Sequence, residues 1–317
     1  MIETATGPDP ARRRFLKEML RVAAAGALAG IVGIPPLLRE LAAAGRLYHW
    51  RGLALGGEAH LWVEAADAEQ AAHLVAIALA EKDRLERIFS LYRPDSVLCR
   101  LNRAGDLAHP PPELVEVLSL ARRVWEASGG AFDVTIQPLY AALASGSADD
   151  GSLRRARDRI GMHRVVFDAG RVGFTRPGMA LSFNGIAQGY ITDRVAAELA
   201  AAGCRNALVQ FGEVRALGHA PGRAPWPVRV AGLADDALAG APAIAVTDTA
   251  GTRIAGRYQH VLDPRTGAPV AARRALAVAA PSAALADALS TALAVLDPQA
   301  ASRLLAAFPG SRARRLA

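Results

Sequence analysis

The chain has 317 residues, of which 52% are hydrophobic and 21% are charged, and its formal net charge is +7. This apolar content is enough for a substantial core, so a largely disordered chain is excluded. The basic residues are scattered and no segment is typical of a DNA-recognition helix, so nucleic acid is not an expected partner, and an anionic small molecule fits the charge better.

The first 44 residues are predicted to be an export signal. Arg12–Lys17 has the twin-arginine pattern, an uncharged stretch rich in Ala and Gly runs from Val22 to Leu38, and Ala42–Ala44 supplies small residues for a signal peptidase. We therefore expect one periplasmic domain over residues 45–317. The alternative is an uncleaved membrane anchor, because the stretch approaches the ~18 apolar residues of a membrane span.

Strands and helices follow each other without a regular period in the expected domain. Ala59–Glu64 alternates like a strand, Ala68–Phe89 has helical spacing, and Arg164–Phe174 is typical of a hairpin. Further strands are predicted at Ala207–Phe211, Pro227–Ala231, Ala243–Thr247 and Leu276–Ala280, and further helices at Glu113–Ser128, Gly189–Ala202, Ala283–Leu296 and Pro298–Phe308. This order predicts an α+β layered domain with a mixed sheet and not a doubly wound nucleotide fold.

Two other features of the domain concern its loops and its cysteines. Ala144–Arg157 is typical of a solvated insertion or a lid. Cys99 and Cys204 are expected to be free and mostly buried, since twin-arginine substrates cross the membrane already folded.

Turn residues follow a histidine in the segment Gln259–Gly267. The Asp-Pro-x-Thr-Gly end is turn chemistry and by itself requires only a loop. His260 stands just before it, and an imidazole on a rigid loop can serve as a general base or orient another group, although a lone histidine is more often a surface or core residue.

A carboxylate and a hydroxyl group share one helix face near the C-terminus. Asp287 and Thr291 are four residues apart on the predicted helix that begins near Ala283. Hard oxygen ligands of this kind suit Mg²⁺, which also binds substrate phosphates. An exposed Asp and Thr on an ordinary helix is the alternative, but the Ala-rich surroundings favour a buried face.

Two glycine-containing segments complete the candidate site. Ser182–Asp193 is a loop that leads into a helix, where the backbone can approach a phosphate or a metal closely and the helix N-terminus favours an anion. A helix cap with tight packing is the alternative reading. In Gly129–Thr135, two glycines end a helix and precede Phe132 and Asp133.

Five ordered segments, spread between about Leu53 and Leu296, resemble motifs of the ApbE-type FAD:protein FMN transferases, a family of exported bacterial flavin transferases. The segments are Ser90-Leu91-Tyr92 with Ser96 and Asn102, Gly130–Thr135, Asn184–Asp193, His260–Gly267 and Ala286–Thr291. The sequence departs from the family pattern at Gln188, where many members have Lys, and at Gly212-Glu213, where the family has paired glycines before an acidic residue.

The resemblance implies an α+β flavin transferase fold with a central FAD cleft. It implies FAD as the donor substrate and Mg²⁺ as the cofactor, with catalytic roles for His260 and Asp287. Its metal ligands would be the Gly185 carbonyl, Asp287 and Thr291. FAD would contact Leu55, Tyr92, Ala131, Phe132, Asp133, Ser182, Gln188 and Val261.

The implied reaction is transfer of FMN from FAD to a Thr or Ser hydroxyl of an acceptor protein, with release of AMP. The expected acceptor is a periplasmic or membrane-bound redox protein. Two alternatives remain open: Mg²⁺-dependent hydrolysis of FAD to FMN and AMP, and a non-catalytic exported flavin-binding protein.

Overall fold

A computed structural model describes residues 47–54, 57–146, 149–220, 225–230, 233, 238, 240–249, 253–254, 258–270 and 275–316. The predicted export signal and Leu55 lie outside these residues. Within these ranges, no helix combines the length and the apolar composition that crossing a membrane requires.

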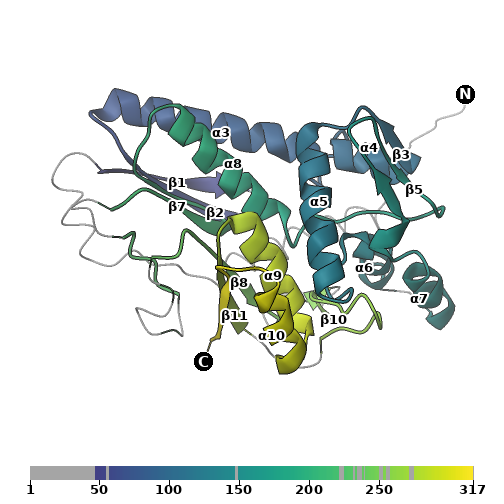
Figure 1. The fold of residues 1–317 in the computed structure, drawn as a ribbon. Coiled ribbons are helices and arrows are strands. Elements are labelled where there is room, and N and C mark those ends of the chain that lie inside the picture. The colour runs from purple at the N-terminus through teal and green to yellow at the C-terminus, as the bar shows by residue number, and fades with distance from the viewer. Residues whose placement is uncertain are drawn as a thin grey trace, which may run out of the picture.

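The fold is built on an antiparallel sheet of seven strands in the order β1-β2-β6-β7-β8-β11-β12 (Figure 1). These strands are β1 (Leu47–Ala54), β2 (Gly57–Glu64), β6 (Ala207–Phe211), β7 (Glu213–Leu217), β8 (Ala243–Asp248), β11 (Ala275–Ala280) and β12 (Arg312–Arg315). Side chains alternate between the two faces of the sheet, so Leu61 and Val209 enter one core while Trp62 and Leu208 enter another.

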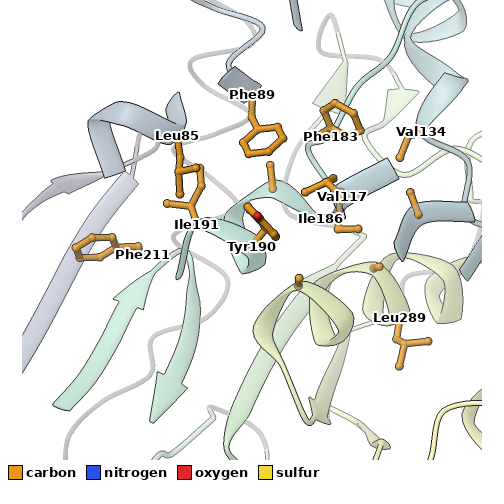
Figure 2. Close-up of a cluster of buried hydrophobic side chains, with 14 of the residues drawn as sticks. Leu85, Phe89, Val117, Val134, Phe183, Ile186, Tyr190, Ile191, Phe211 and Leu289 are labelled. Atoms are coloured by element: carbon orange, nitrogen blue, oxygen red, sulfur yellow. The ribbon is translucent and has the colours of Figure 1, made fainter. Parts of the chain in front are cut away.

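Three helices, α3 (Ala68–Phe89), α8 (Ala187–Ala201) and α9 (Ala283–Val295), pack on the face that carries Leu61 (Figure 1). Figure 2 shows the buried side chains between these helices and the sheet. Phe89 of α3 contacts the rings of Phe183 and Tyr190 edge-on, with ring centroids 5.7 Å and 5.5 Å away. Because Phe183 and Ile186 are buried here, the loop that precedes α8 is anchored in the core.

The opposite face of the sheet is covered partly by irregular chain. Trp226 and Val230 are buried against this face, and the Trp226 Nε1–H donates to the Leu217 carbonyl at 2.9 Å. The predicted strand Pro227–Ala231 is wrong over residues 227–230, which form no extended strand, and Ala231 lies outside the described residues. Arg229 takes part in a single bridge only, and Val228 and Val230 pack on the sheet as part of a covering segment.

A second region flanks the sheet. It contains α4 (Val97–Ala104), α5 (Pro112–Ala127), α6 (Gln137–Ala144), α7 (Asp150–Arg157) and a small sheet of β3 (Asp106–Ala108), β5 (Arg171–Phe174) and β4 (Val165–Phe167). The remaining elements are β9 (Arg253–Ile254), β10 (Tyr258–Gln259) and α10 (Pro298–Ala306), with short 3-10 turns at Val134–Ile136 and Met162–Arg164.

Most predicted elements are confirmed. The helix Ala68–Phe89 has the predicted ends, and the predicted hairpin is formed by β4 and β5. The predicted insertion is helical over Asp150–Arg157, and both cysteines are free, with Cys204 buried and Cys99 half-buried. The elements without a prediction include β1, α4 and β7.

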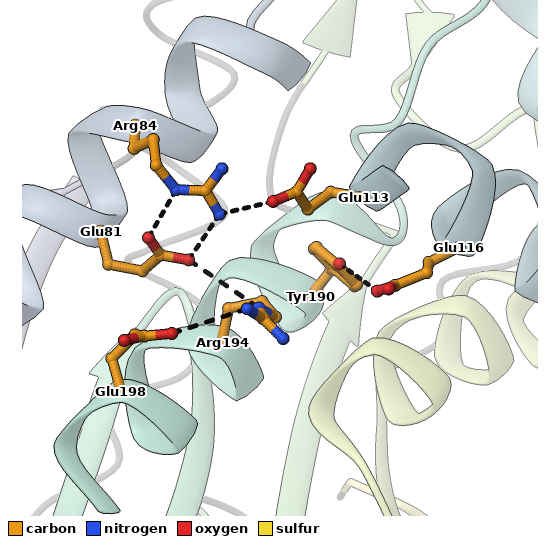
Figure 3. A network of polar contacts seen from close by, with 7 residues as sticks. All are labelled: Glu81, Arg84, Glu113, Glu116, Tyr190, Arg194 and Glu198. Carbon is orange, nitrogen blue, oxygen red and sulfur yellow. Dashed lines mark hydrogen bonds and ion pairs between the residues drawn. The ribbon is translucent and has the colours of Figure 1, made fainter. Parts of the chain in front are cut away.

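A network of charged side chains joins α3, α5 and α8 (Figure 3). Arg84 binds Glu81 through its Nε at 2.7 Å and its Nη2 at 2.9 Å, and it also binds Glu113 at 2.7 Å. The Tyr190 hydroxyl donates to Glu116. Burial would lower the pKa of the Arg84 guanidinium, but the hydrogen bond to Glu81, the largest effect, and that to Glu113 raise it. The network fixes α8, which carries part of the candidate site, against two neighbouring helices.

Replacing Glu81 with glutamine is expected to lower the free energy of unfolding by about 1–2 kcal/mol, because a buried acceptor of a charged hydrogen bond is weakened while Arg84 keeps Glu113 and solvent. Urea denaturation measures this loss. Glu198→Gln is the control, because the Glu198 carboxylate is 41% exposed and lies 3.6 Å from Arg194. It should change the same quantity by less than about 0.5 kcal/mol, and an equal loss in both variants would contradict the special role of Glu81.

Candidate active site

Asp287 and Thr291 lie on α9 as the sequence predicts, and the helix face around Asp287 is buried. The Asp287 side chain is 5% exposed, and its Oδ2 accepts a hydrogen bond from the Gly189 N–H at 3.2 Å. Gly189 belongs to the first turn of α8, so the carboxylate faces the positive end of that helix. An exposed Asp on an ordinary helix is therefore excluded.

The start of α9 is held by a residue of α8. The Asp193 carboxylate accepts hydrogen bonds from the N–H groups of Ala283 and Ala284, both at 2.9 Å, and Ser282 caps the Leu285 N–H at 3.2 Å. Burial raises the pKa of Asp193, and these hydrogen bonds and the nearby Arg215 oppose that shift. Asp193 thus acts as a positioning residue for the helix that carries Asp287.

Replacing Asp193 with alanine is expected to lower the free energy of unfolding by about 1–2 kcal/mol, because two N–H groups at the start of α9 lose their acceptor. Asp193→Asn should lose clearly less, since an amide oxygen also accepts at a helix N-terminus. Chemical denaturation of the two variants measures the difference. Equal stability of wild type and the alanine variant would show that the cap contributes nothing.

Gly185, in the loop before α8, and Gly189, in the first turn of α8, allow this part of the chain to approach α9 closely. A Cβ atom on Gly185 would lie 2.8 Å from the Thr291 Oγ1 and 3.4 Å from Phe132 Cε2. A Cβ atom on Gly189 would lie 2.2 Å from the Ala283 carbonyl oxygen. The structure therefore brings together Gly185, Thr291 and Phe132, three residues that are far apart in the sequence.

A second carboxylate lies near Asp287. Glu213 begins β7 and is 8% exposed. Burial raises its pKa well above the ordinary value, and the negative charge of Asp287 raises it further. Burial likewise raises the pKa of Asp287, opposed by the Gly189 hydrogen bond. Among the described residues, no Arg, Lys or His forms an ion pair with either carboxylate, and no group of three or more His, Cys, Asp or Glu residues is arranged around a metal position.

These features fit a hard cation. A buried carboxylate without a cationic partner among the described residues, a threonine hydroxyl and a backbone carbonyl are oxygen donors of the kind that Mg²⁺ binds together with phosphates and water. The predicted ligands Gly185, Asp287 and Thr291 would supply the carbonyl, the carboxylate and the hydroxyl.

The Asp133 carboxylate accepts three hydrogen bonds from within the protein. Its Oδ1 accepts from the Thr135 N–H at 2.8 Å and from the Thr135 hydroxyl at 2.6 Å, and its Oδ2 accepts from the Met162 N–H at 3.0 Å. Burial raises its pKa, although these hydrogen bonds favour the charged form. Asp133 thus shapes the turn after Phe132, which is buried together with Ala131. Any contact of the carboxylate with a ligand would add to these bonds.

The loop after β10 has the turn geometry that its sequence predicts. The Gly267 N–H donates to the Asp263 carbonyl at 2.7 Å, and the Asp263 carboxylate binds Arg265 at 2.8 Å. Burial would raise the pKa of Asp263, but the hydrogen bonds with Arg265 lower it overall. His260 is half-buried at the start of this loop, and Val261 is buried. These bonds hold the turn Asp263–Gly267, which directly follows His260 and Val261.

Contacts also connect this loop to the other candidate segments. A Cβ atom on Gly130 would lie 3.7 Å from Arg265 Cγ, and Arg157 Nη1 donates to the Thr266 carbonyl at 2.9 Å. Tyr92 packs in the same apolar cluster as Leu262, and burial raises the pKa of Tyr92 to about 12.

The last predicted contact residues flank the start of α8. The Ser182 N–H donates to the Val134 carbonyl at 2.7 Å, which ties this loop to the segment after Phe132. The Gln188 side chain lies against Gly212, whose φ of +94° is available to glycine at low cost. Leu55 lies outside the described residues.

Sequence reasoning did not select Asp193 or Glu213 as members of the site. In the sequence, Asp193 stood out only as the last residue of the segment Asn184–Asp193. Glu213 could have been found from its place directly after the apolar strand Ala207–Phe211 and a glycine, since an acidic residue at the end of a buried strand requires a partner.

The fold defined by this sheet and these helices is that of the flavin transferases. The structure resembles the apo form of the flavinyl transferase ApbE of Pseudomonas stutzeri with a TM-score of 0.70 and 25% sequence identity, covering 86% of this chain and 96% of that one. It resembles the ApbE protein of Thermotoga maritima with a TM-score of 0.71 and 26% identity, covering 85% and 94%.

The sequence model of the ApbE family matches residues 55–314, and the chain belongs to this family. It is 27% identical over 265 residues to the FAD:protein FMN transferase of Klebsiella pneumoniae, covering 75% of each protein. It is 29% identical over 259 residues to the enzyme of the same name from Treponema pallidum, covering 71% of this chain and 72% of that one. The chain is therefore a transferase enzyme. The predicted family and α+β fold class are confirmed, with an antiparallel sheet where a mixed one was predicted.

Proposed function

We propose that this enzyme transfers the FMN half of FAD to a Thr or Ser hydroxyl of an acceptor protein, with Mg²⁺ as its cofactor and AMP as the second product. Membership of the ApbE family supports the transfer of a flavin from FAD. The observation that carries the magnesium site is the buried Asp287 carboxylate, which has no cationic partner among the described residues and lies on the same helix as Thr291, beside Gly185.

In the proposed reaction, the acceptor hydroxyl oxygen attacks the phosphorus on the FMN side of the FAD pyrophosphate. A new phosphorus–oxygen ester bond forms, the bond from that phosphorus to the bridging oxygen breaks, and AMP leaves with the bridging oxygen. The hydroxyl proton passes to a base, for which His260 and Asp287 are the two candidates. Mg²⁺, held by Asp287, Thr291 and the Gly185 carbonyl, would neutralise charge on the phosphate oxygens.

The protein itself contributes mainly position and electrostatics. The N-terminus of α8 supplies partial positive charge close to Asp287, and the buried Phe183 and Ile186 anchor the loop that carries Gly185 in the core. The Asp263–Arg265 pair holds the turn that directly follows His260.

The test is incubation of the protein with FAD, Mg²⁺ and a candidate acceptor domain, followed by mass spectrometry of the acceptor. Transfer adds the mass of one FMN group to the acceptor, and a chelator should prevent that gain. Release of AMP with an unmodified acceptor would instead indicate the alternative activity, hydrolysis of FAD to FMN and AMP.

A non-catalytic flavin-binding protein is the other alternative. In that case Asp287→Ala should leave FAD affinity, measured by quenching of flavin fluorescence, largely unchanged, and neither the wild type nor the variant should release AMP. Turnover in the wild type that is lost in the variant excludes this alternative.

The proposed location is the periplasm, reached through the twin-arginine route, and the proposed acceptor is a periplasmic or membrane-bound redox protein. The pattern Arg12–Lys17 and the small residues Ala42–Ala44 support this proposal. Cell fractionation followed by N-terminal sequencing tests it: a mature N-terminus near Gly45 is expected, while an intact signal in the membrane fraction would indicate an anchor.

A further inference from the structure

Glu213 faces the helix layer from the sheet. In the β6–β7 ladder Glu213 is paired with Phe211, whose side chain is in the core beneath α3 and α8. Cross-strand partners point to the same face of a sheet, so the Glu213 side chain also points toward the helices. Glu213, from the sheet, and Asp287, from α9, therefore both point into the layer between the sheet and the helices.

The Glu213 and Asp287 carboxylates both lie beside the first turn of α8. The Gly189 N–H, in the first turn of α8, donates to Asp287, while the side chain of the preceding Gln188 lies against Gly212, directly before Glu213. Thr192 Oγ1, one turn further along α8, lies 3.4 Å from the Phe211 carbonyl oxygen. The start of α8 thus fixes the position of Glu213 as well as that of Asp287.

The protein supplies too little positive charge for this pair. The Val246 backbone lowers the pKa of Glu213 against the larger effect of burial, and the Gly189 N–H donates to Asp287. Neither carboxylate pairs with an Arg, Lys or His among the described residues. Two buried negative charges near each other are unfavourable unless a cation or a proton compensates for them.

We propose that Glu213 is a positioning residue of the cation site, which supplies a second negative charge beside Asp287 and raises the affinity of the site for Mg²⁺. This inference rests on the proposed function, because it concerns the cation that serves FAD there. The geometry assigns the role to Glu213 through its face of the sheet, its burial and its place beside the first turn of α8. Without this charge, the cation would be held by one carboxylate and neutral oxygens only.

Glu213→Gln keeps the shape of the side chain and removes its charge. We expect it to change the Mg²⁺ requirement more than the maximal rate. The Mg²⁺ concentration for half-maximal turnover should rise about 10-fold or more, the size of effect typical of residues that support metal ligands. The rate at saturating Mg²⁺ should change much less. Glu213→Asp, which keeps the charge, should require less Mg²⁺ than Glu213→Gln.

A second readout does not depend on turnover. The melting temperature of the full chain with saturating FAD is measured as Mg²⁺ is added. The wild type should be stabilised by Mg²⁺, Asp287→Asn should lose this stabilisation, and Glu213→Gln should need about 10-fold more Mg²⁺ to reach it. Without metal, Glu213→Gln should melt no lower than the wild type, because it removes a buried acidic group that has no cationic partner among the described residues.

Glu64→Gln is the matched control. Glu64 binds Asn206 just before β6, whereas Glu213 follows the other end of that strand. The control loses the same charge from the same sheet and should keep the wild-type Mg²⁺ dependence.

Three results would overturn the inference. If Glu213→Gln retains the wild-type Mg²⁺ dependence while Asp287→Asn loses it, Glu213 only fills the core and the proposed function stands. If Glu64→Gln shifts the dependence as much as Glu213→Gln, the effect is one of overall charge. If the wild type shows no response to Mg²⁺ at all, the magnesium-dependent function fails together with this inference.

Discussion

Asp287→Asn is expected to reduce FMN transfer by about 10²–10³-fold, the loss typical when one preorganised group that stabilises developing charge is removed. Asparagine keeps the size of the side chain and an oxygen that can accept from the Gly189 N–H, so the fold should persist. The charge that would attract Mg²⁺ is lost. The measurement is the initial rate at which an acceptor gains the mass of FMN at saturating FAD, with circular dichroism as the check on folding.

The control for this experiment is Asp297→Asn. Asp297 caps α10 by accepting from the Ala300 N–H at 2.8 Å, and asparagine is an equally good cap. The same chemical change should therefore leave the transfer rate within about two-fold of wild type, a difference of under ~0.5 kcal/mol. An Asp287→Asn enzyme with the wild-type rate and Mg²⁺ requirement would show that this carboxylate does not serve the reaction.

Gly189→Ala is expected to lower the free energy of unfolding by about 3 kcal/mol, at the upper end of the usual cost of overpacking. The added Cβ would lie 2.2 Å from the Ala283 carbonyl oxygen and 2.7 Å from the Ala284 nitrogen, and backbone atoms cannot move aside as a side chain can. The same displacement would separate Asp287 from the start of α8. The melting temperature should fall by roughly 6 °C or more, and transfer should be lost with it.

Gly151→Ala is the matched control for Gly189→Ala, since Gly151 also lies in a helix. There an added Cβ would lie 3.2 Å from the Arg155 Nη1, which belongs to a flexible side chain that can move, and 3.5 Å from the Asp149 Oδ1, an ordinary contact distance. Alanine should be neutral or stabilise the protein by about 0.5–1 kcal/mol, because glycine weakens helices. If both variants lose the same stability, the close crossing of α8 and α9 is not the cause.

The part of the fold that the sequence predicted is the part with strong periodicity. Ala68–Phe89 extends over many turns with an apolar stripe, and its ends agree with the structure. β1 was not predicted because its exposed positions His49, Arg51 and Leu53 differ widely in polarity and give no alternating pattern. It forms a strand by pairing with β2, and this tertiary contact is not visible in the local sequence. The strand predicted from Pro227 was wrong because alternating valines can pack on a sheet without joining it.

The sequence predicted which residue types belong to the candidate site, but it did not predict how these residues are arranged in space. The spacing of Asp287 and Thr291 follows from helix geometry alone, and the structure agrees. That Gly185 meets Thr291, and that Asp193 caps α9, depends on how α8 crosses α9, which local pattern does not encode. Likewise, the importance of Glu213 arises only from burial beside Asp287.

The cap that Asp193 places on α9 also has a consequence for the order of events in folding. The two ends of this contact are 90 residues apart, and the Gly189–Asp287 contact spans 98 residues. Contacts of such long range form only after the intervening chain has closed its loops. The environment of Asp287 therefore exists only after α9 has packed on α8, so the cation site that we propose would form only in the completely folded chain.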